Sequence, residues 1–268
     1  MIIIGEKING SIPATGKAIS ERNADYIRSI AKSQTDAEAN YLDVCASINL
    51  GELEMVKWLI DLTQEVSDLP ICIDSPDPQV CIDAIPFCKK PGIINSVSLE
   101  GGKIDIVFPA IKDTKWGCIA LLCDDKGIPK DSATRIEIFR GIMARAGEFG
   151  IAPDRLYIDP LVEALGTNGE SLITFVETTT EIKKLYPDVH ITSGLSNISF
   201  GLPSRKTVNM AFMTLAINAG MDSAIIDPTN RDMMGAIFAT DALLGNDDFC
   251  LEYIGAYREG LIGTPPKA

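Results

Sequence analysis

The chain has 268 residues, of which 46% are hydrophobic and 23% charged, enough for one large α/β barrel or two ordinary domains. Its formal net charge of −13 argues against binding to nucleic acid phosphates or to an anionic lipid surface. No apolar run is long enough to cross a bilayer, and the first residues lack the features of a signal peptide, so we expect a cytoplasmic location.

Cysteine and histidine content limits the chemistry further. The seven cysteines include no Cys-x-x-Cys pair, and His190 is the only histidine, which argues against a Cys/His zinc site. His190 opens an expected strand, and in a barrel that end lies away from the active site. We therefore do not expect Ser–His–Asp or Cys–His catalysis.

Short apolar runs alternate eight times with segments of helical periodicity. The expected strands are 1–5, 41–46, 71–73, 92–95, 116–123, 156–158, 190–195 and 224–226. The expected helices are 16–36, 52–66, one starting at Pro78, 102–113, 132–148, 171–185, 204–219 and 231–244, with a short closing helix near 250–258. The core face expected for 132–148 consists of Ile136, Phe139, Ile142, Met143 and Ala146.

Continuous apolar strands separated by helices indicate a parallel sheet that is covered on its outer face. Eight strand–helix repeats in about 250 residues match a single (β/α)8 TIM barrel. An open doubly wound sheet is the alternative, but no Gly-x-Gly-x-x-Gly follows the first strand. No linker divides the sequence, so we expect one domain over 1–268, with a short C-terminal tail from about 245.

Polar side chains follow nearly every expected strand. In a barrel the C-terminal strand ends share one rim, and neighbouring strands lie about 4.8 Å apart, so these groups converge on one pocket. Each of them alone could simply cap a turn or the next helix. The set is Glu6, Asn9, Asp43, Asp74, Asn95, Ser96, Asp124, Asp159, Ser196, Asn197 and Asp227.

The chemistry of this set narrows the ligand. Acids and amides without a basic residue among them argue against phosphate as the main ligand, although carboxylates could hold Mg²⁺ or Mn²⁺. They also suit an uncharged heterocycle rich in N–H groups, such as a 2-amino-4-oxo pterin, whose adjacent donors one carboxylate accepts as a pair. Small residues at Ser193, Gly194 and Ser196 let a flat ring approach the backbone, and the Asn197 amide both donates and accepts.

Seven short motifs, at 5–10, 42–44, 73–75, 94–96, 127–131, 157–161 and 194–199, occur in order along nearly the whole chain. Together they resemble the pterin-binding methyltransferases, which include the methyltetrahydrofolate:corrinoid protein methyltransferases and the folate module of cobalamin-dependent methionine synthase. Dihydropteroate synthase is a more distant relative. The resemblance implies a TIM barrel, usually a homodimer, that binds tetrahydrofolate or 5-methyltetrahydrofolate as its substrate.

The resemblance also implies roles for individual residues. Asp74, Asn95 and Asp159 would hold the pterin ring, and Asn197 would act catalytically beside N5, the atom that carries the methyl group. Arg205 would lie near the p-aminobenzoyl-glutamate tail. The full substrate-binding set is Asp74, Asn95, Ser96, Asp159, Gly194, Ser196, Asn197 and Arg205, with Glu6, Asn9, Asp43 and Asp227 as further candidates and no directly bound metal.

The run at 43–47 is most similar to the branch that demethylates methylated amines or betaines in anaerobes, where a methyl group moves from a methylcorrinoid protein to tetrahydrofolate. The chain has no Asp-x-His-x-x-Gly motif, so another protein would carry the cobalamin and dock over the rim loops. Cys45 and Phe200 depart from the family pattern, which often has Asn and a polar residue there, and both make the pocket mouth less polar.

Three other functions stay open, the third of which is a metal-dependent, aldolase-type barrel. A dihydropteroate synthase-like enzyme would need basic residues for pyrophosphate. Arg205 and Lys206 are present, but the Lys-x-x-Arg pattern expected near the last strand is not. A non-catalytic folate-binding barrel is the second alternative, and the density of polar rim residues disfavours it.

Overall fold

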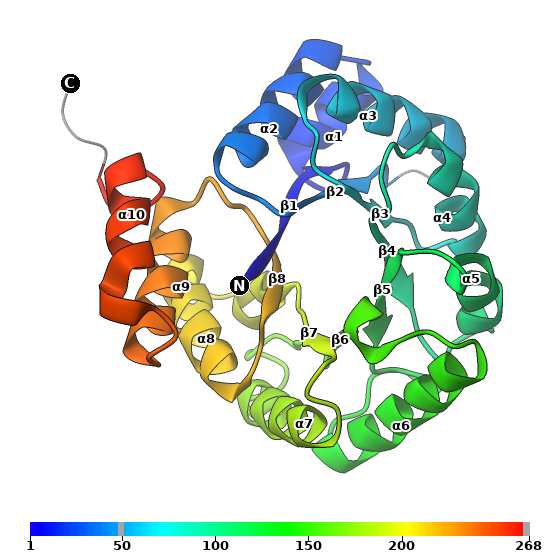
Figure 1. Cartoon of the computed structure of the whole chain (residues 1–268), viewed down its shortest axis with the longest axis vertical. Helices are drawn as coiled ribbons and strands as arrows, with labels where there is room; N and C mark the ends of the chain where they lie inside the picture. Colours follow the sequence, from blue (N-terminus) through cyan, green and yellow to red (C-terminus); the bar gives the residue numbers. More distant parts are fainter. Residues whose placement is uncertain (48–50, 265–268) are drawn as a thin grey trace.

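The computed structural model describes residues 1–47 and 51–264. Eight parallel strands follow one another around a central axis, and helices cover their outer side (Figure 1). The strands are β1 (Ile2–Asn9), β2 (Tyr41–Cys45), β3 (Ile71–Asp74), β4 (Ile93–Val97), β5 (Gly117–Leu121), β6 (Leu156–Asp159), β7 (His190–Ile191) and β8 (Ser223–Ile226).

The helices between the strands are α1 (Pro13–Ser20), α2 (Ala24–Asp36), α3 (Glu52–Val66), α4 (Pro78–Ala84), α5 (Lys103–Ile111), α6 (Ser132–Glu148), α7 (Ser171–Leu185), α8 (Arg205–Ala219) and α9 (Arg231–Leu243). The closing helix is α10 (Leu251–Glu259), and short 3-10 turns are η1 (Ile85–Phe87), η2 (Pro153–Arg155), η3 (Leu195–Ser199) and η4 (Asp248–Cys250). Within the described residues, no helix combines the length and apolarity needed to cross a membrane.

The barrel is closed. Each strand from β1 to β6 pairs in parallel with the next, and β1 also pairs with β8. Two backbone hydrogen bonds join the remaining gap: the Asp222 amide donates to the Ile191 carbonyl at 3.3 Å, and the Ile225 amide to the Ser193 carbonyl at 3.2 Å. The predicted (β/α)8 architecture is confirmed.

The barrel interior is built in layers because alternate side chains of each strand point inward. An apolar layer of Ile4, Cys72, Ile93, Ile119 and Tyr157 fills the middle. Two residues further along their strands, on the same inward face, stand Glu6, Asp74, Asn95 and Asp159, and Asp43 follows Tyr41 in the same way. A two-residue step moves about 6.6 Å along a strand, so the polar residues form the next layer toward the rim.

Three expected elements differ from the structure. The first strand, expected over 1–5, continues to Asn9. The helix expected over 16–36 is divided into α1 and α2, because Arg22 has a left-handed φ of 53° and the Asn23 side chain accepts a hydrogen bond from the Tyr26 amide as the cap of α2. The strand expected over 190–195 ends at Ile191, and the chain turns into η3 at Leu195. The following helix begins at Arg205, within one residue of the prediction.

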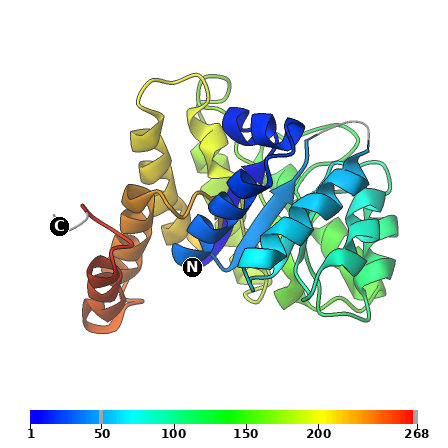
Figure 2. The same cartoon turned by 90° about the horizontal axis from the view of Figure 1, so that it is seen from above.

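The two ends of the barrel are separate surfaces. Figure 2 shows the loop that leads from η3 into α8 at one end and the N terminus of β1 toward the other. We call these ends the rim, where the strands finish, and the base, where they begin. Helix α10 packs against α9 on the outside of the barrel (Figures 1 and 2).

Candidate functional site

Four carboxylates of the polar layer, Glu6, Asp43, Asp74 and Asp159, are called the rim acids here. Asn95 on β4 is joined to one of these acids on β2, because its Nδ2 donates to Asp43 Oδ1 at 3.3 Å. Strand register places Asp74 beside Cys45 on one side and Asn95 on the other. The charges of Asp74 and Glu6 both raise the pKa of Asp43, so strands β1 to β3 bring these three acids together, and Asp159 stands in the same layer on β6.

The rim acids are held in surroundings that disfavour their charge. Burial raises the pKa of Glu6 to about 7, and nearby Asp227 adds to the effect while Lys7 opposes it. Burial also raises the pKa of Asp74 to about 6 and that of Asp43 well above its usual range, with Asp74 as the second cause for Asp43. These carboxylates lack enough positive partners, so a ligand that offers N–H donors would stabilise their ionised form.

Asp159 is the most firmly oriented of the four. Its Oδ1 accepts a hydrogen bond from the Leu161 amide at 2.8 Å. Burial raises its pKa to about 6, although hydrogen bonds from the Leu161 amide, the Ser193 hydroxyl and the Gly194 amide, together with the Arg135 charge, lower it. An ionised carboxylate has about four acceptor positions, so acceptor capacity remains for a ligand.

The turn η3 presents the residues expected near the reacting atom. Asn197 is exposed, and none of the described residues hydrogen-bonds its side chain. Ser196 is half-buried, and its carbonyl accepts from Arg205 Nη2 at 2.7 Å, while Arg205 Nε donates to Ser199 Oγ at 3.0 Å. Arg205 therefore braces the turn that carries Asn197, and its contact with a folate tail stays a prediction.

Two further candidates already have hydrogen-bond or ion-pair partners within the protein. Asn9 Oδ1 accepts from the Ser11 amide at 2.8 Å, which fixes the turn after β1. Asp227 Oδ2 pairs with Lys7 Nζ at 2.9 Å, and its Oδ1 accepts from the Thr229 amide at 2.9 Å. The expectation of a rim without a basic residue is therefore wrong, because Lys7 stands there beside Asp227. Ser96 is half-buried directly after Asn95.

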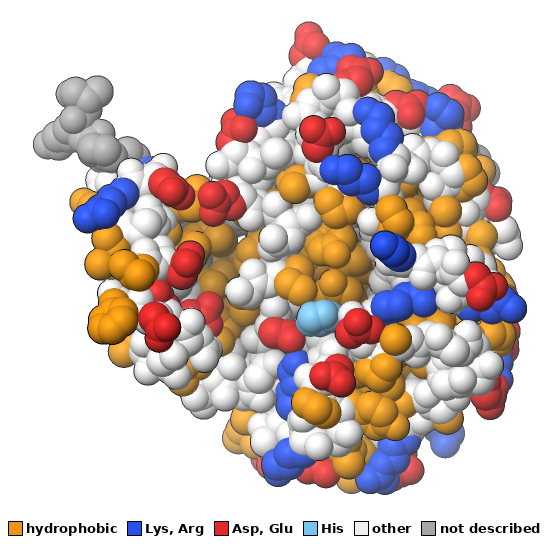
Figure 3. Space-filling view, in the orientation of Figure 1, with side chains coloured by type: hydrophobic (Ala, Val, Ile, Leu, Met, Phe, Trp, Pro, Cys, Tyr) orange, Lys and Arg blue, Asp and Glu red, His pale blue; other side chains and the backbone are white. Residues whose placement is uncertain are grey.

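Cavity size alone does not mark this site. A cavity of about 60 Å³ lies between β1, β8 and η3, lined in part by Glu6, Ser196 and Asp227. A larger hollow, about 550 Å³, lies at the base beside α8 to α10, and Figure 3 shows it between these helices and the barrel body. We place the site at the rim because the convergent acids and amides are there. Among the described residues, no three or more His, Cys, Asp or Glu side chains are arranged to hold a metal ion.

One residue of this region was missed in the sequence. Arg135 is fully buried and touches the turn that follows Asp159. It lies one residue before Ile136 and one helical turn before Phe139, on the face that the apolar periodicity assigns to the core. An arginine on a helix face that is otherwise apolar indicates a buried polar role. That signal was present in the sequence of 132–148.

Comparisons with known proteins agree with this geometry. Residues 14–227 match the family model of the pterin binding enzymes. A protein of Eubacterium limosum named methylcorrinoid:tetrahydrofolate methyltransferase is 51% identical over 266 residues, which cover 98% of each chain. The methionine synthase of Mycobacterium tuberculosis is 31% identical over 253 residues, which cover 86% of this chain and 21% of that much longer protein.

Solved structures share the fold. Dihydropteroate synthase of Xanthomonas albilineans in complex with 7,8-dihydropteroate superposes with a TM-score of 0.63 at 20% identity, covering 91% of this chain and 92% of that one. The enzyme of Yersinia pestis gives 0.65 at 16% identity, covering 91% and 93%. At these identities the likeness concerns the fold alone. The family match over most of the chain and the 51% identity along nearly all of it show that the chain belongs to the pterin-binding enzymes.

Proposed function

We propose that this protein is a methyltransferase that moves a methyl group from a corrinoid carried by a partner protein to N5 of tetrahydrofolate. The observation that carries the proposal is the 51% identity, along 98% of both chains, to a protein named for that reaction. The rim acids fit the substrate independently, because a pterin ring offers the N–H donors that these buried carboxylates lack.

The ring-binding residues set the position of N5. Asp74, Asn95 and Asp159 accept from and donate to the edge of the pterin, and Gly194 and Ser196 let its flat face lie near the backbone. Most of the rate enhancement then comes from holding N5 in line with the incoming methyl group. The partner docks over the rim loops, because only this end exposes the ring.

Asn197 acts at the reacting atom. The methylcorrinoid supplies the methyl group: the N5 lone pair forms the new N–C bond, the Co–C bond breaks, and its electron pair stays on cobalt. N5 gains positive charge and loses its proton to water. The Asn197 amide, exposed and free of other side-chain partners among the described residues, follows this change by shifting its hydrogen bond from donor to acceptor.

The test is direct. The protein is incubated with tetrahydrofolate and free methylcobalamin, and 5-methyltetrahydrofolate is measured by chromatography in parallel with the loss of methylcobalamin absorbance. Formation of 5-methyltetrahydrofolate in equal amount to the methylcobalamin lost supports the proposal. Tight binding of tetrahydrofolate without transfer in either direction would favour the non-catalytic barrel. Preferential binding of 7,8-dihydropterin pyrophosphate would favour a dihydropteroate synthase-like enzyme.

The assembly is part of the proposal: one domain per chain, and two chains per molecule. Large apolar side chains are exposed on α8 to α10 and their connections, most of all Phe249 at 91% and Leu243 at 83%. The others are Leu215, Leu244, Leu251, Tyr253, Ile254 and Tyr257. An aromatic side chain contributes about 150–250 Å² and a leucine or isoleucine less, so together these eight approach the roughly 800 Å² per partner of a standard interface.

A second copy of the chain is the occupant we propose for this surface, because a two-fold pairing covers the same patch on both molecules. Sedimentation equilibrium should report a dimer for the wild type and a monomer for Phe249→Asp combined with Leu243→Asp. A monomeric wild type at micromolar concentration would contradict this arrangement. A cytoplasmic location and the lack of nucleic acid or membrane partners stay predictions from the sequence.

A further inference from the structure

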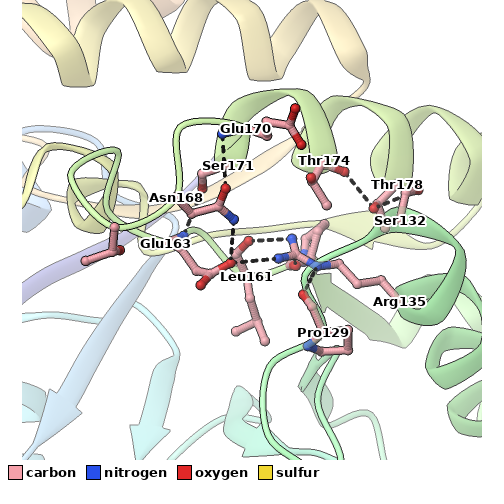
Figure 4. Close-up of polar contacts among 12 residues, drawn as sticks. Pro129, Ser132, Arg135, Leu161, Glu163, Asn168, Glu170, Ser171, Thr174 and Thr178 are labelled. Carbon is pink, nitrogen blue, oxygen red and sulfur yellow. Dashed lines mark hydrogen bonds and ion pairs between the residues drawn. The ribbon is translucent and has the colours of Figure 1, made fainter.

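A single buried arginine joins three segments beneath the rim (Figure 4). Arg135 on α6 has no exposed surface. Its Nε donates to the Pro129 carbonyl at 3.0 Å, in the loop that leads into α6, and its Nη1 donates to the carbonyls of Pro160 at 2.7 Å and Leu161 at 2.9 Å. Its Nη2 lies 3.5 Å from Glu163 Oε2. Two rim loops therefore depend on one side chain for their relative position.

The carbonyls of Pro160 and Leu161 accept hydrogen bonds from the same nitrogen, Arg135 Nη1. Leu161 has a φ of 69°, a left-handed conformation that a leucine rarely adopts. Drawing both flanking carbonyls to Nη1 holds the residue there against its steric cost. In this conformation the Leu161 amide points at Asp159 Oδ1, 2.8 Å away.

Glu163, the acidic partner of Arg135, is also held in place. Glu163 Oε2 accepts from Asn168 Nδ2 at 2.9 Å, and the Glu163 amide donates to Ser171 Oγ at 3.0 Å, at the start of α7. Figure 4 shows Glu163 and Asn168 turned toward the guanidinium from the loop that connects β6 with α7. The segment from Asp159 to Ser171 is thus anchored to α6 at one point and to α7 at another.

We propose that Arg135 is a positioning residue for Asp159: through the Pro160–Leu161 turn it sets the orientation in which that carboxylate meets the ligand. The inference rests on the proposed function in that the ligand is a folate. Arg135 does not touch the ligand itself, since its side chain has no exposed surface.

The electrostatics point the same way. Arg135 and the Leu161 amide are both among the causes that lower the pKa of Asp159, against the larger effect of burial, which leaves it at about 6. Loss of Arg135 removes its positive charge from beside Asp159 and allows the Leu161 amide to move away from Asp159 Oδ1. The pKa of Asp159 then rises, and the pH below which the site loses its ionised acceptor moves upward with it.

A matched control exists at the base. Arg155 also donates to backbone carbonyls, through Nε to Trp116 at 2.9 Å and through Nη2 to Ile111 at 2.7 Å. It sits before β6 rather than after it, so it holds the opposite end of the same strand. Replacing Arg155 removes similar hydrogen bonds without touching the rim.

The experiment compares Arg135→Met with Arg155→Met by calorimetric titration with tetrahydrofolate between pH 5.5 and 8.5. Both variants should unfold at lower urea concentration than the wild type. Only Arg135→Met should weaken folate binding, by about tenfold at pH 7, and move the acidic midpoint of binding to higher pH. In the transfer assay its KM should rise more than its kcat falls.

A second change tests the mechanism within the turn. Leu161→Gly in the Arg135→Met background should restore part of the affinity, because glycine adopts the left-handed conformation without a steric cost. If Arg135→Met does not fold, Arg135→Lys replaces it and should show a smaller loss, since one ammonium cannot reach all the carbonyls. Equal affinities and midpoints for the Arg135 and Arg155 variants would overturn the inference. Failure of the wild type to bind tetrahydrofolate would overturn the proposed function instead.

Discussion

Buried acids at the two ends of this barrel have pKa values shifted in opposite directions. At the base, Asp222 accepts from Lys183 Nζ at 2.9 Å and from the Ile191 amide at 2.8 Å, and it lies 3.2 Å from His190 Nδ1. Burial alone would raise its pKa, but the hydrogen bonds from His190, Lys183 and Ile191 outweigh burial and lower it. At the rim, burial dominates, and the rim acids have raised pKa values.

This difference separates stability from function. The base joins strands β7 and β8 with partners supplied by the protein itself, and His190 stacks on Tyr157 with ring centroids 4.7 Å apart. The sequence analysis expected no catalytic role for His190, and its place among the base contacts fits a structural one. The rim keeps carboxylates buried at a cost to folding, which is understandable where a ligand supplies the missing donors.

The largest expected effect is on ligand binding at the rim. Asp159→Asn removes the charged acceptor of the ring donors, and hydrogen bonds to a charged group contribute about 1.5–3 kcal/mol, so tetrahydrofolate should bind about 10- to 100-fold more weakly. Calorimetric titration measures it, with Asp222→Asn as the base counterpart. Wild-type affinity in Asp159→Asn would show that the ring does not meet this side chain.

The next effect separates chemistry from binding. Asn197→Ala should lower kcat/KM at least tenfold, about 1.4 kcal/mol, while tetrahydrofolate still binds, because the amide acts mainly in the transition state. Asn40→Ala is its counterpart at the base, where Asn40 Oδ1 accepts from the Ile3 amide at 2.7 Å. That variant should lose stability and keep its turnover per folded molecule. Unchanged turnover in Asn197→Ala would remove this residue from the mechanism.

A smaller effect is expected on stability at the base. Asp222→Ala removes hydrogen bonds to Lys183 and the Ile191 amide, but 39% of the Asp222 side chain is exposed, so solvent screening reduces the loss to about 1–2 kcal/mol. Urea unfolding at pH 7 measures it. The folate dissociation constant should not change, and a large change would mean that the two ends are coupled.

The smallest effect has the opposite sign. The folded pKa of Asp43 is raised above its unfolded value, so its contribution to stability is present at low pH and is lost as pH rises through the folded pKa. Asp43→Asn keeps the acceptor for Asn95 without the charge. It should match the wild type near pH 4 and be more stable than the wild type at pH 8, in urea unfolding followed across pH. A variant that is less stable at pH 8 would show that the ionised carboxylate has partners that compensate its burial.

The sequence predicted secondary structure well where an element depends on residues close to it in the chain. The helices α3, α6 and α7 begin and end at the predicted residues 52–66, 132–148 and 171–185. Each has a regular apolar face, and Asp131 caps α6 through the Thr134 amide. The break at Arg22 and the early end of β7 were missed, because a left-handed residue and a missing strand partner leave little trace in the pattern.

The sequence by itself determined the architecture and the identity of the rim acids, because eight repeats of strand and helix leave few ways to bury their apolar faces, and a two-residue period fixes which side chains point inward. Only the tertiary structure decided how those acids are held. The ion pair of Asp227 with Lys7 and the hydrogen bonds of Arg135 to the turn after Asp159 join segments far apart in the chain, and Arg205 holds the turn of Asn197 from the start of the next helix. Hydrogen bonds and charges act through space at distances of about 3 Å, which no spacing along the sequence encodes.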